Sequence, residues 1–274
     1  MNLVWSALII VAVAVPCVAA MLLVRRRAPE GSYFADGDRA AGVFGVLATG
    51  FAVLVGFVVF LAFTSYDKSR VGAEDESLAV GRQIETAQFF PAAVSAELTG
   101  ELVCYGRSVV HVEWPEAESG SPVDEVNPWG VELFRTIRSF QPRTPVEESA
   151  YDKWLDHTAE REAARIDRLH GAVGVIPSPL WIVLILLSIV IVGYMFFFAD
   201  SAERALSQAM LMGTVASTLA AMLLLIQFLD TPFKEGAGGI QPVAMERILR
   251  TVEEALVAVD RAPEPPCDER GRAS

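Results

Sequence analysis

The sequence has few of the residues that metal and redox sites need. Its 274 residues include three cysteines and three histidines, with no CxxC pair and no ligand spacing between the two residue types. We therefore expect no metal site and no cofactor. Cys104 and Cys267 can form a disulfide only if both lie outside the cytoplasm, and unpaired thiols are our expectation.

Signs of catalysis and of nucleic-acid binding are also missing. No nucleophile–base pair, phosphate-binding loop or pair of catalytic carboxylates stands out, so we do not expect an enzyme. Positive charge is scarce, and the net charge of −12 argues against nucleic acid as a partner. The region between the second and third apolar runs shows no strand-like alternation of useful length and no internal repeat, which favours helices.

Long apolar runs are what the sequence does have. Hydrophobic residues make up 53% of the chain, and the mean hydropathy is +0.39. The runs 3–24, 42–64, 180–199 and 206–229 each have about the 20 residues that cross a hydrocarbon core of about 30 Å. No ionisable residue lies in their cores, which argues against an ion-coupled transporter.

The order of these runs predicts an all-α polytopic membrane protein with four transmembrane helices and a helical soluble insert between spans two and three. The insert is acidic, with 20 Asp and Glu against 11 Lys and Arg over residues 65–178. The expected divisions are 1–64 for spans one and two, 65–178 for the insert, 179–229 for spans three and four, 230–262 for a C-terminal loop and amphipathic helix, and 263–274 for a disordered tail.

The charges that flank the spans leave the orientation almost balanced. Five basic residues lie near the span ends on each side of the membrane. The triplet Arg25, Arg26 and Arg27 follows the first run, which fits a signal-anchor span rather than a cleaved signal peptide. Because positive loops stay inside, we expect a multi-pass plasma-membrane protein with its N-terminus, insert and C-terminus outside the cytoplasm.

The insert itself is expected to consist of helices. A stripe of apolar residues between Val94 and Val112 predicts an amphipathic helix that ends at Trp114 and Pro115. A loop, a short helix over 129–140 and a charged helix over 147–170 follow. A further amphipathic helix is expected over 245–259 in the C-terminal part.

Three arginines form a ridge on the charged helix. Arg161, Arg165 and Arg168 fall at i, i+4 and i+7, on one helix face. The ridge could bind anions or line a permeation path. It could instead pair with acids of a neighbouring helix, for which Asp67, Glu74 and Glu85 have suitable spacing, and we favour this structural ion-pair role.

Span two differs from the other spans. It carries Gly42, Gly45, Gly50 and Gly56, small residues that allow close helix contacts in lipid. Its helical pattern continues past the membrane boundary through "TSYDKSRVGAEDESLAV" until Pro91 stops it. A helix of about 45 residues would measure roughly 65–70 Å, twice the hydrocarbon thickness, and could line both a pore and a vestibule.

Four sequence blocks resemble the bacterial bestrophin-like family. They are "YGRSVVHVEWP" (105–115), "REAARIDRL" (161–169), "PSPLW" (177–181) and "LDTPFKEGAGGIQP" (229–242), in that order along nearly the whole chain. The resemblance implies a four-span, all-helical membrane protein. The family is in turn distantly similar to true bestrophins, which are pentameric ion channels.

One local match to true bestrophins concerns the pore. Their narrowest segment has three apolar side chains of span two, four residues apart, with the last following a glycine. The resemblance therefore implies Thr49, Val53 and Phe57 as the constriction, with Phe60 and Thr64 on adjacent turns. Thr49 is polar where the pattern has an aliphatic residue. The aromatic-rich motif after span two is also replaced by "TSYDKSR", so ion selectivity does not carry over.

Two functions from different classes follow. The first is an oligomeric channel for small inorganic ions, pentameric by analogy with the family. Its span two lines the pore, and Asp67 and Glu74 form acidic vestibule rings that lean slightly toward cations. The second is a non-conducting membrane scaffold or sensor whose helical insert binds a partner protein.

Overall fold

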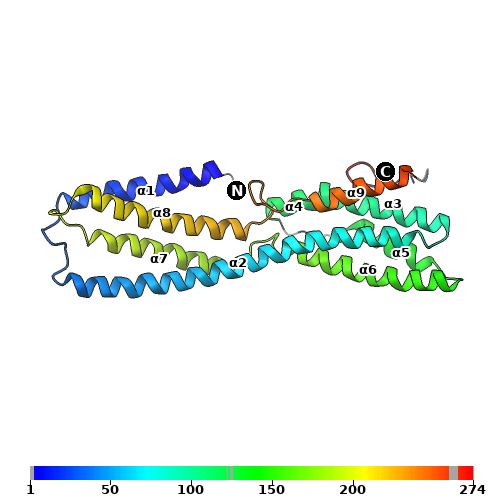
Figure 1. The fold of residues 1–274 in the computed structure, drawn as a ribbon, viewed down its shortest axis with the longest axis horizontal. Helices are drawn as coiled ribbons and strands as arrows, with labels where there is room; N and C mark the ends of the chain where they lie inside the picture. Colours follow the sequence, from blue (N-terminus) through cyan, green and yellow to red (C-terminus); the bar gives the residue numbers. More distant parts are fainter. Residues whose placement is uncertain (1–2, 122, 124–125, 259–264, 274) are drawn as a thin grey trace. The chain divides into compact units, whose positions relative to one another are not determined.

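The computed structural model describes residues 3–121, 123, 126–258 and 265–273. It confirms the all-α prediction, since every regular element in this part of the chain is a helix and four of them are long and apolar enough to span a bilayer. The chain divides into two units, whose elements are labelled in Figure 1. We call residues 1–64, 175–230 and 235–238 the membrane unit, and residues 65–174, 231–234 and 239–274 the insert unit.

The membrane unit consists of α1 (Leu3–Arg25), the first part of α2 (Gly37–Ala87), α7 (Ser178–Phe196) and α8 (Ala205–Asp230). Each predicted apolar run forms one of these helices. Helices α1 and α8 lie closely side by side, and α7 also contacts α8 (Figure 1).

Aromatic side chains gather where α7 ends. Phe34, in the loop between α1 and α2, stacks on Tyr194 with ring centroids 5.4 Å apart, and Phe44 of α2 also stacks on Tyr194 at 5.6 Å. Phe198 contacts Phe34 at 5.0 Å. Clusters of this kind are typical of the membrane–water interface, where amphipathic rings anchor helix ends.

Asp230 ties the end of α8 to the start of α7. Its Oδ1 accepts hydrogen bonds from the backbone nitrogens of Val175 (2.7 Å) and Ile176 (3.0 Å), and its side chain is buried. The indole nitrogen of Trp181 donates to Oδ2 at 3.4 Å. The carboxylate thus satisfies backbone donors that precede α7, which fixes the connection between the last two spans.

Helix α2 is continuous over 51 residues, or about 75 Å at 1.5 Å per residue. It confirms the expected passage from membrane helix to charged helix, although it begins five residues earlier than the apolar run. Asp36 explains the early start, because its Oδ1 accepts a 3.0 Å hydrogen bond from the backbone nitrogen of Arg39, as an N-cap residue does. The second part of α2 belongs to the insert unit.

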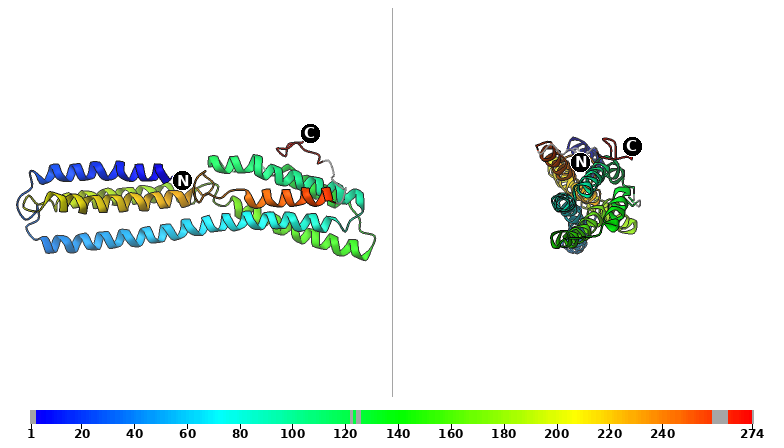
Figure 2. Two further views of the ribbon diagram at one scale, coloured as in Figure 1. Left: turned by 45° about the horizontal axis from the view of Figure 1, so that its top comes forward. Right: turned by 90° about the vertical axis from the view of Figure 1, so that its right-hand side faces the viewer.

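The other helices of the insert unit are α3 (Ala92–Ser108), the π-helix η1 (Val109–Glu113), α4 (Trp114–Ser119), α5 (Pro128–Ser139), α6 (Pro145–Leu169) and α9 (Val243–Ala258). Helix α6 runs alongside the second part of α2 (Figures 1 and 2). Aromatic residues fill much of the core. Phe90 contacts Phe140 at 5.1 Å and Trp154 at 6.0 Å, measured between ring centroids.

Local sequence signals start two of these helices. Asn127 accepts a 3.0 Å hydrogen bond from the backbone nitrogen of Trp129 at the start of α5, and Thr144 accepts one of 3.2 Å from Glu147 at the start of α6. In both helices proline occupies the first turn, where its missing N–H costs nothing.

The predicted end at Trp114 and Pro115 is wrong, because the helical path continues through η1 into α4 and ends at Ser119. Proline is tolerated there because Pro115 lies in the first turn of α4, directly after the π-helix, where its missing N–H breaks no α-helical bond.

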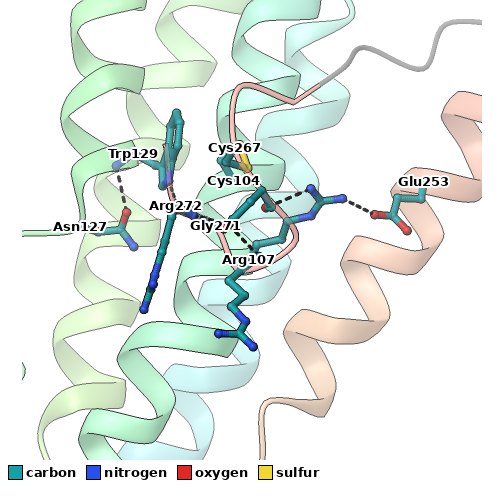
Figure 3. Close-up of a disulfide and its surroundings, with 10 residues drawn as sticks. Cys104, Arg107, Asn127, Trp129, Glu253, Cys267, Gly271 and Arg272 are labelled. Carbon is teal, nitrogen blue, oxygen red and sulfur yellow. Dashed lines mark hydrogen bonds and ion pairs between the residues drawn. A yellow bond between two sulfur atoms is a disulfide. The ribbon is translucent and has the colours of Figure 1, made fainter. Parts of the chain in front are cut away.

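The C-terminal segment corrects two expectations. Residues 265–273, which we expected to be disordered, form a turn that is joined to α3 by a Cys104–Cys267 disulfide with a Cα–Cα distance of 5.8 Å (Figure 3). The two thiols are therefore not unpaired. Local composition could not show this cross-link, because its two residues lie 163 positions apart. Residues 259, 263, 264 and 274 of the expected tail helix and tail lie outside the described residues.

Further contacts hold the same turn against α3 and α5 of the insert unit. The indole nitrogen of Trp129 donates a 2.6 Å hydrogen bond to the carbonyl of Gly271 (Figure 3). Gly271 has a φ of 74° and lies so close to the backbone of Ser108 that a side chain there would clash with it. Arg107 of α3 contacts the turn at the carbonyl of Asp268 and also pairs with Glu253 of α9 at 3.1 Å.

Candidate functional site

The face of α2 that carries the predicted pore residues is uncovered in the single chain. Val53, Phe57 and Phe60 are 58%, 67% and 65% exposed, and Thr49 and Thr64 are exposed as well. The opposite face is buried and consists of Phe51, Val55, Val58 and Ala62. The structure therefore places all five predicted residues on one side of α2, and this side faces either lipid or other copies of the chain.

The glycines of α2 lie beside this face without a neighbour. At Gly42, Gly45, Gly50 and Gly56, an added Cβ would meet no heavy atom of the described chain within 4 Å, apart from the local backbone of α2 itself. Small residues on membrane helices usually allow close packing against another helix. No helix of the described part of this chain packs against these glycines.

The predicted vestibule acids are joined by a cation. Arg70 forms 3.0 Å ion pairs with both Asp67, three residues before it, and Glu74, four residues after it. All three side chains are exposed and surrounded by solvent, which weakens such pairs. The three residues together carry one net negative charge per chain, rather than the two that we expected from the acids alone.

The arginine ridge lies inside the insert unit, with partners that the sequence did not single out. Arg168 is fully buried and pairs with Glu76 of α2 and with Glu113 of η1. Arg165 pairs with Glu113 at 3.0 Å. The suggested partners Asp67 and Glu74 pair with Arg70 instead, and Glu76 and Glu113 take the role that we assigned to those acids and to Glu85.

Arg161 differs from the other two arginines. It is only 2% exposed, yet no carboxylate of the described residues lies within ion-pair distance of it. Its Nη1 donates a 2.9 Å hydrogen bond to Oε1 of Gln83, and its guanidinium carbon lies 4.7 Å from the ring centroid of Tyr105. Within the described part of the chain its Nε has no hydrogen-bond partner.

The π-helix η1 aims Glu113 into this network. Its wider turn ends at Glu113, whose Oε1 accepts hydrogen bonds from Nη2 of Arg165 (3.0 Å) and from the side-chain amide of Asn127 (2.9 Å). Single π-helical turns within α-helices often occur at functional sites. Here the turn connects α6, the start of α5 and, through Arg168, α2.

Sequence reasoning missed Glu76, Glu113 and Tyr105, although one signal was present. On α2 a stripe of small and polar residues is buried at helical spacing, and it consists of Ser65, Ser69, Gly72, Glu76 and Gln83. A polar stripe along an extramembrane helix that also has exposed apolar residues indicates a buried polar contact. It could have identified Glu76 as an arginine partner.

The charges in the network stabilise one another. Burial opposes the ionised form of Glu113, but the charges of Arg168 and Arg165 outweigh it and lower the pKa of this carboxyl. Burial also disfavours the charged form of Arg168, yet Glu76 and Glu113 raise its pKa above the ordinary value. Burial and the neighbouring Glu76 raise the pKa of Tyr105, so its hydroxyl stays protonated.

A pocket of about 410 Å³ opens beside this network. Its polar floor is formed by Arg161, Arg165, Tyr105 and Asn127, and apolar residues such as Phe134 and Ile166 form its rim. Pockets of 300–1,000 Å³ are typical of sites for small molecules. No group of three or more His, Cys, Asp or Glu side chains that could hold a metal occurs among the described residues.

These features define a class of protein, an all-helical membrane protein with four spans whose second span continues into a helical insert. The model of the bestrophin-like domain matches residues 8–245, and the chain therefore belongs to the bestrophin-like family, as its sequence blocks predict.

Solved structures show the same fold. The chain is similar to a bacterial bestrophin homolog from Klebsiella pneumoniae that carries a point mutation, with a TM-score of 0.63 and 13% identity over 92% of this chain and 97% of that chain. The structure of the homolog solved by Zn-SAD phasing gives a TM-score of 0.63 and 13% identity, over 92% of this chain and 98% of that chain. No curated protein matches this chain by sequence.

Proposed function

We propose that this protein is an oligomeric bestrophin-like ion channel with α2 lining the pore. One observation carries the proposal: Thr49, Val53, Phe57, Phe60 and Thr64 share an uncovered face of α2, beside glycines that no helix of the described part of the chain contacts. Around a symmetry axis, this face would form stacked apolar rings about 6 Å apart. Such rings can gate a pore by dewetting.

The proposed assembly is a homo-oligomer, a pentamer by analogy with bestrophins, and its substrates are small inorganic ions rather than molecules to be transformed. We leave open whether the permeant ion is a cation or an anion, with a slight preference for cations. That preference rests on Asp67 and Glu74, whose two negative charges exceed the one positive charge of Arg70. A ring of these groups at the mouth of a pore would select by sign.

We also propose that the N-terminus, insert unit and C-terminus lie outside the cytoplasm, in a plasma membrane. The Cys104–Cys267 disulfide supports this orientation, because disulfides persist in oxidising compartments and are rare in the cytosol. Alkaline phosphatase fused after Ser274 is expected to be active in intact cells. A fluorescent protein that folds only in the cytoplasm would contradict the orientation if it fluoresced at the same position.

The channel proposal is tested by recording from planar bilayers with purified protein in a KCl gradient. Stepwise currents are expected, and Phe57→Ala is expected to enlarge the unit current because it widens the apolar ring. Phe63→Ala is the matched control, since Phe63 is also exposed but points about 120° away around the helix. The sign of the reversal potential then identifies the permeant ion as a cation or an anion.

Silence from both folded proteins would contradict the channel. It would favour the second hypothesis, a non-conducting scaffold or sensor whose insert unit binds a partner protein. Currents that respond equally to Phe57→Ala and Phe63→Ala would retain the channel but remove Phe57 from its constriction.

A further inference from the structure

We propose that the pocket beside Arg161 binds a small organic carboxylate, with the carboxylate on the arginine and an apolar body against the rim. The inference concerns the insert unit alone and does not require that the protein conducts ions. Its starting point is the buried charge of Arg161, which has no carboxylate of the described residues within ion-pair distance.

Among the described residues, the buried network holds more arginines than carboxylates. Arg161, Arg165 and Arg168 bring three positive charges, whereas Glu76 and Glu113 bring two negative ones. Arg168 and Arg165 each pair with a carboxylate, whereas no carboxylate of the described residues lies within ion-pair distance of Arg161. A buried charge without a partner is costly, and one carboxylate would neutralise this one. Glu162 also borders the pocket, but its side chain is exposed to water, which screens its charge.

The guanidinium of Arg161 has an N–H donor without a hydrogen-bond partner among the described residues. Among the described residues, Nη1 donates a hydrogen bond to Gln83, while Nε has no partner. Tyr105, which also lines the pocket, holds the guanidinium in place with its ring face at 4.7 Å. A guanidinium fixed in this way is suited to bind a carboxylate.

The rim of the pocket selects the rest of the ligand. Phe134, Ile166 and Val126 border the pocket and are 58%, 67% and 71% exposed, which is unusual for large apolar residues that gather in one place. Chloride or phosphate would make no use of them. The volume of about 410 Å³ accommodates a short aliphatic or aromatic acid, so the combination of cationic floor and apolar rim fits a monocarboxylate such as hexanoate or benzoate.

The test measures ligand-induced stabilisation of the full chain in nanodiscs of zwitterionic lipid, which avoids competition from detergent. Hexanoate is expected to raise the unfolding midpoint in a concentration-dependent manner. Hexanamide, which has the same shape without the charge, and chloride at equal ionic strength are expected to raise it much less. A null result with hexanoate and benzoate would overturn the proposal, as would an equal rise with hexanamide or chloride.

Variants connect the binding to this pocket. Arg161→Gln is expected to weaken hexanoate binding at least tenfold, because it removes a charge-assisted contact. Phe134→Ala, at an exposed position where folding is not at risk, is expected to weaken it about tenfold. Arg138→Gln is the control, an exposed arginine of α5 outside the pocket, and should leave the affinity unchanged. Unaltered affinity in Phe134→Ala would place the ligand elsewhere and refute the assignment, even if Arg161→Gln fails to fold.

Discussion

The hydroxyl of Tyr105 donates a 2.6 Å hydrogen bond to Oε1 of Glu76, and both groups are buried. Glu76 also accepts hydrogen bonds from Arg168, so this carboxylate joins α2, α3 and α6. A buried ion pair of this kind gives little net stability by itself, but the loss of one partner leaves a charge uncompensated. The contact therefore matters more for the arrangement of the three helices than for the total stability of the insert unit.

Replacement of Tyr105 by phenylalanine tests this contact. The variant removes one donor to a buried carboxylate and is expected to lower the free energy of unfolding by about 1.5–3 kcal/mol. Tyr151→Phe is the matched control, because the hydroxyl of Tyr151 has no hydrogen-bond partner in the described part of the chain and its loss should be nearly neutral. Thermal unfolding followed by tryptophan fluorescence measures both. Equal midpoints for Tyr105→Phe and wild type would show that Glu76 does not depend on the hydroxyl.

Gly72 is predicted to be irreplaceable although it weakens a helix. A Cβ at this position would lie 2.8 Å from the carbonyl oxygen of Ala164 and would also clash with the backbone of Arg168. Gly72→Ala should gain about 1 kcal/mol of helix propensity but lose more, because α2 and α6 must separate and the Glu76–Arg168 pair must stretch. Gly81→Ala, where the nearest atom is a flexible isoleucine methyl at 3.4 Å, should be neutral or stabilising. A stabilised Gly72→Ala protein would disprove the close contact.

Glu101 makes the stability of the insert unit depend on pH. Burial raises the pKa of this carboxyl to about 7, from an ordinary value of 4.5, and the hydrogen bond from Thr136 offsets only part of the rise. The folded state thus holds the proton more tightly than the unfolded state. Its contribution to stability is complete below about pH 4.5 and is lost as the pH rises to about 7.

Glu101→Gln is expected to remove this dependence. The variant should exceed the wild type in stability at pH 8 by a few kcal/mol and approach it at pH 5. Glu97→Gln, which alters an exposed carboxylate one turn earlier on α3, is the control and should follow the wild type. Unfolding midpoints at the two pH values decide the matter, and a Glu101→Gln profile parallel to that of the wild type would contradict the assignment.

The disulfide is predicted to be the strongest single constraint on the C-terminal turn. It closes a loop of 163 residues, which in the chain-entropy model stabilises the folded state by up to about 5 kcal/mol. Cys104→Ser should lower the unfolding midpoint, and a reductant should do the same to the wild type but not to the variant. Maleimide labelling of denatured, non-reduced protein should detect one thiol, that of Cys17. Three labelled thiols would show that the disulfide is absent.

The sequence predicted those parts of the structure that depend on the order of residues within one segment. The four spans follow from apolar length, and the continuity of α2 follows from the absence of proline between Gly37 and Ala87. The arginine ridge was found from its spacing, but its partners were not, because several acids had suitable periodicity and only tertiary packing selects Glu76 and Glu113. The π-turn that directs Glu113 inward has no local signature in the sequence.

Because α2 is continuous, the direction in which each of its side chains points depends on the number of residues between them. Each residue of an α-helix is rotated by about 100° from the one before it, so a single insertion between Ser69 and Glu76 would rotate the Ser69–Gly171 contact relative to the Glu76–Arg168 pair by that angle. Insertions of seven, eleven or eighteen residues would nearly restore the original phase, because they correspond to almost whole numbers of turns. The rotational spacing of these two contacts along α2 is therefore fixed by the turn of the helix.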